Sequence, residues 1–197
     1  MIPIASIVEG DGEVSALPIL LRRMATQWAP NTVINPLQPI RVRRDRFLNK
    51  EEEFRRQLLL AAAKSGEDGW ILIVLDADDD CPATLGQNTY ERAQQYVPHR
   101  RLSVVLANRE FEAWFIAAAR SLDGARGFYI SPAELLEAET PRNAKGWMRE
   151  HMRSGTYSEI LDQPAFAARI DLQQALDNSR SFRKLHKEWQ THVTQRP

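Results

Sequence analysis

The chain has 197 residues, and its 26 lysines and arginines balance 26 aspartates and glutamates. This length is enough for one sizeable domain, and a net charge of zero excludes an overall attraction to polyanions. One cysteine, Cys81, excludes an intramolecular disulfide. No apolar segment is long enough to span a bilayer and the N-terminus lacks a signal-type pattern, so we expect a cytoplasmic protein without a membrane partner.

The first predicted unit is a strand, a glycine turn and a helix. Residues 3–8 are short, apolar and β-branched, and the turn that follows reads Glu9-Gly10-Asp11-Gly12-Glu13. Helical spacing then places apolar residues on one face, at Val14, Leu17, Leu21, Met24 and Trp28. No Lys-Ser/Thr follows the second glycine, so this turn is not a Walker phosphate loop.

The next segment combines a loop, a basic cluster and a helix. Three prolines in residues 29–39 predict loop with at most one short strand. Residues 40–43 alternate and predict an edge strand within a cluster that contains Arg41, Arg43 and Arg44. A helix is expected over residues 49–64, because three glutamates stand at its start.

Two apolar runs predict buried strands of a parallel sheet. Residues 70–75 form an unbroken apolar run that ends in Asp76-Ala77-Asp78-Asp79-Asp80, and residues 102–107 form another. A helix is expected between them over residues 88–96. After the second strand, Asn108 is a good N-cap for a helix whose first turn contains Glu110 and Glu112.

The sequence beyond Leu122 has no strong strand signal. A linker over residues 123–127 precedes short helical patterns at residues 131–138, 142–152, 164–176 and 181–193. We therefore predict an α/β fold, with a mostly parallel, Rossmann-like sheet flanked by helices in residues 1–122. A helical extension, residues 123–197, is expected to pack on this core.

Acidic residues follow every strongly predicted strand. Since the carboxyl ends of parallel strands share one edge of a sheet, these acids are expected to lie together. Crowded carboxylates repel one another, and a hard cation such as Mg²⁺ or Mn²⁺ relieves that cost. The candidate metal ligands are Glu9, Glu13, Asp76, Asp78, Glu110 and Glu112. A plainer interpretation is that Glu13 and Glu110 only favour helix starts and that Asp79 and Asp80 are solvated turn residues.

Other proteins also use closely spaced aspartates. An EF-hand loop starting at Asp76 would need glycine at Cys81 and glutamate at Gln87, so it is excluded. Haloacid-dehalogenase-type phosphatases carry Asp-x-Asp after their first strand, usually followed by threonine, where this chain has Asp80. Metal-dependent glycosyltransferases also use Asp-x-Asp and remain a weaker alternative.

The pattern of Glu9 in a glycine turn and of Asp76-Ala77-Asp78 after a later strand resembles the Toprim domain. Topoisomerases, bacterial primases and the overcoming-lysogenization-defect (OLD) nucleases share that domain. The second glutamate, Glu13, and Leu17-Pro18 look most like the nuclease branch. The whole chain resembles an uncharacterised bacterial family, domain of unknown function 4276, often encoded beside ATPases. There is no room for the tyrosine-bearing domains of topoisomerases, and one cysteine excludes a primase zinc module.

The resemblance implies a metal-dependent nuclease or phosphodiester-transfer enzyme that acts on nucleic acid, in bacterial defence with a partner ATPase. Glu9, Asp76 and Asp78 would hold Mg²⁺ or Mn²⁺, and Glu13 would add a ligand or position water. Nuclease relatives commonly carry a positively charged residue near the site, contributed late in the chain, and Lys184 is the expected catalytic residue of this kind. Basic side chains expected to contact nucleic acid are Arg41, Arg43, Arg44, Arg180 and Arg183. The alternative is a non-catalytic Toprim-fold module that binds an ATPase or nucleic acid, and we also consider a homodimer.

Overall fold

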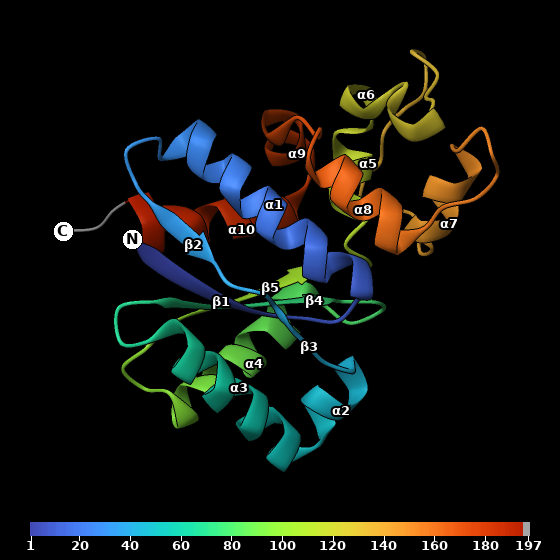
Figure 1. Cartoon of the computed structure of the whole chain (residues 1–197). Helices are drawn as coiled ribbons and strands as arrows, with labels where there is room; N and C mark the ends of the chain where they lie inside the picture. The colour runs from blue at the N-terminus through green and yellow to red at the C-terminus, as the bar shows by residue number, and fades with distance from the viewer. Residues whose placement is uncertain (195–197) are drawn as a thin grey trace.

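A single parallel sheet forms the middle layer of the computed structural model, which describes residues 1–194 (Figure 1). Its strands within that range are β1 (Ile2–Val8), β2 (Ile34–Pro36), β3 (Ile40–Arg41), β4 (Trp70–Asp76) and β5 (Arg101–Ala107). The strand order is β2-β1-β4-β5, and β3 pairs with β1 beyond the end of β2. The predicted Rossmann-like α/β fold is confirmed.

Helices cover both faces of the sheet (Figure 1). One face carries α2 (Arg44–Asn49), α3 (Glu51–Ser65) and α4 (Pro82–Tyr96). The other face carries α1 (Asp11–Trp28), α5 (Ala113–Ala117), α8 (Glu159–Ala167), α9 (Leu172–Asn178) and α10 (Arg180–Trp189). The remaining short elements are α6 (Ala119–Leu122), a 3₁₀ turn (Ala125–Gly127), α7 (Ala144–Glu150) and a π turn (Gln190–Thr194).

The central strand β4 is buried along its whole length because its two rows of side chains enter different cores. Trp70, Leu72 and Val74 pack under α1 and α5, whereas the alternate residues pack under α3 and α4. A strand that buries both faces needs apolar residues at every position. This explains the unbroken apolar run in the sequence.

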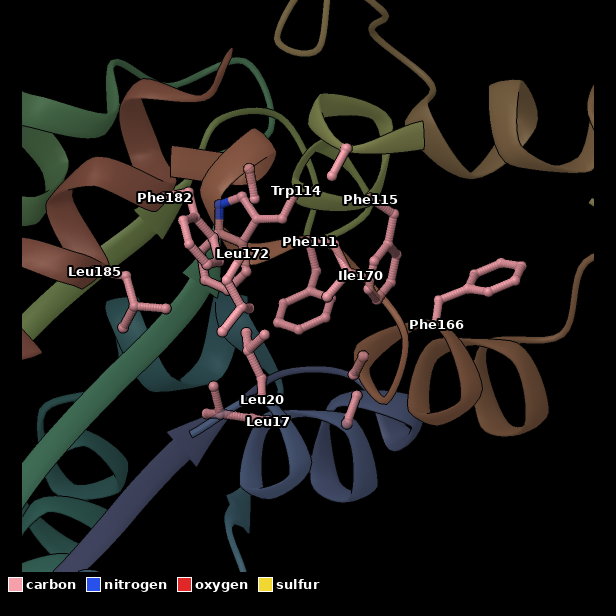
Figure 2. Packing of buried hydrophobic residues seen from close by; sticks show 14 of the residues in the cluster. Leu17, Leu20, Phe111, Trp114, Phe115, Phe166, Ile170, Leu172, Phe182 and Leu185 are labelled. Carbon is pink, nitrogen blue, oxygen red and sulfur yellow. The ribbon is translucent and has the colours of Figure 1, made fainter. Parts of the chain in front are cut away.

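The C-terminal helices share one hydrophobic core with α1 and the sheet. Leu17 and Leu20 of α1 lie in the same cluster as Phe166 of α8 and Phe182 and Leu185 of α10 (Figure 2). The two predicted parts, residues 1–122 and 123–197, therefore meet in a common core. Residues 195–197 of the second part lie outside the described residues.

Local predictions fail where side chains compete with helical hydrogen bonds. The helix expected over residues 131–138 is wrong, since the chain forms turns there and Arg120 bonds the carbonyl oxygens of Pro132 and Glu134. Asn108 is not an N-cap, because its amide donates to Glu139 and α5 begins only at Ala113. The helix expected over residues 49–64 is confirmed as α3, whereas the helix expected over 164–176 is interrupted at residues 168–171.

The strand order changes direction between β1 and β4. The chain passes from β1 outward to β2 and β3, then crosses to β4 and β5 on the other side. At such a switch point a crevice opens beyond the carboxyl ends of the two central strands. Glu9 follows β1 and Asp76 ends β4, so both acids stand at this crevice. No helix in the described part of the chain is both long and apolar enough to cross a membrane.

Candidate functional site

Acidic side chains from three strand ends converge at the switch point. A cavity of about 490 Å³ lies there, and its walls include Glu9, Glu13, Asp76 and Lys145. Glu110 and Glu112 follow β5 and reach the same cluster through Lys145. The predicted co-location of these acids is therefore seen in the structure. Their co-location does not by itself make these acids metal ligands.

Asp76 is held rigidly at the floor of the cluster. Its carboxylate accepts a hydrogen bond from the buried backbone N–H of Phe111 at 2.8 Å. The residue is only 5% exposed. Burial, followed by the nearby carboxylate of Glu13, raises the pKa of Asp76 well above its usual range. The segment after β5 thus fixes the carboxylate that ends β4.

Glu13 turns back onto the glycine turn that precedes α1. Its two oxygens accept from the backbone N–H groups of Glu9 and Gly10, both at 3.3 Å, as in a capping box. Burial and the charge of Glu112 raise the pKa of Glu13 to about 8. Glu9 is also affected, since burial and Asp78 raise its pKa. One Glu9 oxygen, Oε2, is buried without a hydrogen-bond partner among the described residues.

Glu112 is fully buried at the back of the cluster. Its Oε1 accepts from Gln163 Nε2 at 2.7 Å and from the Tyr157 hydroxyl at 3.1 Å. Its Oε2 makes no hydrogen bond in residues 1–194 but faces Lys145 Nζ at 3.8 Å. Burial raises the pKa of Glu112. Burial and Glu112 together raise the pKa of Tyr157 well above its usual range, so Tyr157 stays a hydrogen-bond donor.

Lys145, at the start of α7, is the cation of the cluster. Its Nζ lies 3.5 Å from Asp76 Oδ2 and 3.5 Å from Glu110 Oε1. Glu110 also accepts from the Lys145 backbone N–H at 2.9 Å, which fixes the start of the helix on the acids. Burial alone would lower the pKa of Lys145, but Glu112, Asp76 and Glu110 raise it above its usual value. The ammonium group therefore stays charged at neutral pH.

The loop after β4 is pinned by two arginines. Arg44, whose side chain is 12% exposed, donates to the carbonyl oxygen of Asp76 at 2.9 Å and pairs with Asp78 and Asp80. Arg109 donates to the carbonyl oxygen of Asp78 at 3.1 Å. Asp78 and Arg109 both have positive φ angles, of 50° and 68°. Asp78 is more exposed than Asp76 and does not line the acidic cavity.

The five arginines predicted to contact nucleic acid do not lie together in the structure. Arg41 lines the acidic cavity and pairs with Asp11 at 3.0 Å, and exposed Arg43 lies beside it. Arg44 is instead engaged with the aspartate loop. Arg183 donates to carbonyl oxygens at the end of α9, and Arg180 lines a second cavity.

The structure does not bring Lys184 to the acids. Its Nζ pairs with Glu188 at 2.5 Å on the exposed side of α10, and it lines the second cavity with Arg180. Lys145 occupies the position among the carboxylates that was expected for a late basic residue. The distance in sequence between Lys145 and the acids could not predict this contact, since only the packing of α7 brings Lys145 to them. Tyr157 and Gln163 likewise had no recognisable sequence pattern.

The fit of a divalent cation to this site rests on donor chemistry. Carboxylate oxygens are the preferred ligands of Mg²⁺, and the unpartnered Oε2 of Glu9 leaves an acceptor unsatisfied. In residues 1–194, however, no group of three or more Asp, Glu, His or Cys side chains is arranged around one ion position. Glu9, Asp76 and Asp78 therefore fit such an ion by chemical type, and would have to converge further to ligate it.

Comparisons with known proteins identify the family of this chain. No curated protein and no solved structure matches it. A family model does match, over residues 8–189, a range that contains β2 to β5, the acidic cluster and α10. The chain belongs to the family described as Domain of unknown function (DUF4276).

Proposed function

We propose that this protein is a Toprim-like hydrolase of the OLD-nuclease type, which cleaves phosphodiester bonds in nucleic acid with the help of Mg²⁺ or Mn²⁺. The observation that supports the proposal is the meeting of Glu9, Asp76 and Glu110 at one crevice, from three different strand ends. The partner ATPase and the role in bacterial defence are parts of the proposal that rest on the sequence resemblance alone.

Glu9, Asp76 and Asp78 would hold the metal ion. A divalent cation in such a site activates water and stabilises the leaving oxygen of a phosphodiester. Glu13, whose pKa is raised to about 8, holds a proton at neutral pH and would position the attacking water by hydrogen bonding. The Lys145 ammonium neutralises charge that develops on the phosphate.

Substrate would enter past the basic side chains at the rim. Arg41 lines the acidic cavity and also a smaller cavity, of about 230 Å³, with Arg43 and Arg46. These exposed guanidinium groups would contact phosphates of the nucleic acid near the scissile bond. Because such contacts release counterions, binding is expected to weaken with rising salt.

The first test is calorimetric titration of Mg²⁺ and Mn²⁺ into wild type and into the double variant Glu9→Gln/Asp76→Asn. We expect binding by wild type only. Glu52→Gln, an exposed acid on α3, is the matched control and should bind as wild type does. Cleavage of single-stranded and duplex DNA and RNA is then measured with the same three proteins. Absence of both metal binding and cleavage, or cleavage that survives the double substitution, would contradict the proposal.

A second candidate function is a non-catalytic module that binds a partner. The observation that favours it is Lys145, which already places a positive charge among Asp76, Glu110 and Glu112 without any metal. If this ion-pair cluster is structural, the Glu9→Gln/Asp76→Asn variant loses stability but wild type shows no metal binding. The titration therefore separates the two functions.

A further inference from the structure

The outer edge of β5 is open. Among the described strands β5 pairs only with β4, and the hydrogen bond from Ala77 N to Ala107 O fixes its register. Because alternate residues of a strand point their backbone groups to opposite sides, those of Leu102, Val104 and Leu106 point away from β4. No hydrogen bond to these groups from elsewhere in residues 1–194 is seen.

A groove of about 990 Å³ runs along this free edge. Leu102, Val104 and Leu106 form its floor, α4 forms one wall and α10 the other. Gly86 of α4 faces the strand so closely that a Cβ atom there would lie 3.3 Å from Leu106 Cδ2. A long, regular edge strand is usually shielded against pairing. Here α4 and α10 flank the edge, so that Leu102, Val104 and Leu106 are each 4% exposed, and Glu188 accepts from Ser103 Oγ at 2.5 Å.

Two arginines that line the groove, Arg101 and Arg180, form no ion pair in residues 1–194, and the acid Glu139 is held only by neutral donors. Lys184 is paired with Glu188. Arg101 Nη1, in contrast, is buried without a hydrogen-bond partner among the described residues. Arg180 is exposed at the opposite end and makes no ion pair in that range. The groove is therefore complementary to a segment with negative charge.

A second copy of this chain does not suit the groove. α10 runs antiparallel to β5. At the start of α10, Ser181 and Asn108, which follows β5, both donate hydrogen bonds to Glu139. Near the end of α10, Glu188 accepts a hydrogen bond from Ser103, which is close to the start of β5. A two-fold axis between two β5 strands would bring Arg101 of one copy to Arg180 of the other. Like charges placed together oppose association, so a different chain is favoured.

We propose that this groove binds an extended, acidic segment of a partner protein, which adds to the sheet as a strand beside β5. Main-chain hydrogen bonds would supply affinity, and the cationic ends would select the charge of the segment. The proposal does not depend on nuclease activity, since the groove and the acidic cavity share no lining residue.

The probe for the test is a fluorescein-labelled peptide of eight residues in which valine and glutamate alternate. Binding is followed by fluorescence anisotropy, by hydrogen exchange and by alkylation of Cys81, which is exposed at the groove and is the one cysteine of the sequence. We expect the peptide to slow exchange of the Leu102, Val104 and Leu106 amides and to slow alkylation. A peptide N-methylated at alternate residues, which cannot pair with a strand edge, should not bind.

Charge reversal tests the predicted selectivity. Arg101→Glu and Arg180→Glu should each weaken binding about tenfold, whereas Arg55→Glu, at an exposed site on α3 away from the groove, should leave it unchanged. Equal binding of the N-methylated peptide, unchanged amide exchange, or no binding at millimolar peptide would overturn the proposal. Protection of Cys81 by a single-stranded oligonucleotide but not by the peptide would assign the groove to nucleic acid instead.

Discussion

At the scale of single residues, Glu13 links the stability of the fold to pH. Its pKa rises from an ordinary 4.5 to about 8 on folding, so the folded state binds the proton more tightly than the unfolded state. Stability should therefore fall as pH rises from about 4.5 to about 8, by at most about 5 kcal/mol from this group. The raised pKa values of Glu9, Asp76 and Glu112 act in the same direction.

Glu13→Gln should flatten this dependence, because an amide cannot lose the proton. The free energy of unfolding, measured with urea between pH 5 and pH 9, should decline less steeply than in wild type. Glu52→Gln, which changes an exposed first-turn acid of α3, should keep the wild-type slope. Identical slopes for wild type and Glu13→Gln would show that Glu13 titrates normally.

Lys145→Met should destabilise the protein in a pH-dependent way. The ammonium group lowers the pKa values of Asp76 and Glu112, so its loss leaves buried carboxylates without a counter-charge. Removing one partner of a fully buried ion pair lowers the free energy of unfolding by about 3–5 kcal/mol. Lys145 is 30% exposed, so we expect about 1–3 kcal/mol at pH 8 and less at pH 5.

Thermal melts at both pH values measure this effect. Lys187→Met, at an exposed position on α10, is the control and should change the melting temperature little. Added Mg²⁺ should restore part of the stability of Lys145→Met if a divalent cation can replace the ammonium group. A loss of stability that is equal at pH 5 and pH 8 would contradict an electrostatic role.

At the scale of elements, the close contact of α1 with α8 depends on Gly12. A Cβ atom at this position would overlap Gln163 Oε1 and the carbonyl oxygen of Glu159. Backbone cannot move aside cheaply, so Gly12→Ala should destabilise the protein by more than about 2 kcal/mol. It should also disturb the hydrogen bond from Gln163 to Glu112 and with it the acidic site.

Gly86→Ala is the matched control, since Gly86 also lies within a helix. A Cβ atom there meets only the end of the flexible Leu106 side chain. The higher helix propensity of alanine, about 1 kcal/mol, offsets that contact, so the net change should be below about 1 kcal/mol. Urea unfolding of both variants checks this ranking, which equal effects would refute.

At the scale of the whole molecule, the sheet cannot bury one face without the C-terminal helices. Trp70, Trp114 and Leu17 pack in the same cluster as Phe182 and Trp189 of α10. A chain that ends at Leu122 would expose this apolar face. We expect it to bind the dye ANS and to lose the cooperative urea transition of the full chain. A cooperative transition in residues 1–122 would instead show that they form an independent domain.

Much of the central fold could be predicted from the sequence. The apolar runs before Asp76 and Asn108 are buried strands because a parallel sheet covered on both faces needs apolar residues throughout. The position of Glu9 and Asp76 at one edge follows from parallel strand direction alone. The helices after Leu122 were less predictable, since side-chain bonds such as those of Arg120 decide where they break.

The sequence by itself determined that acids from three strand ends would meet, because unbroken apolar runs separated by helices favour parallel strands. Only the tertiary structure decided that Lys145 stands among them and that Lys184 does not. It also decided that Arg44 pins the aspartate loop and that the edge of β5 stays open between α4 and α10. These features depend on how helices that are far apart in the sequence pack together, and the spacing of residues along the chain does not predict that packing.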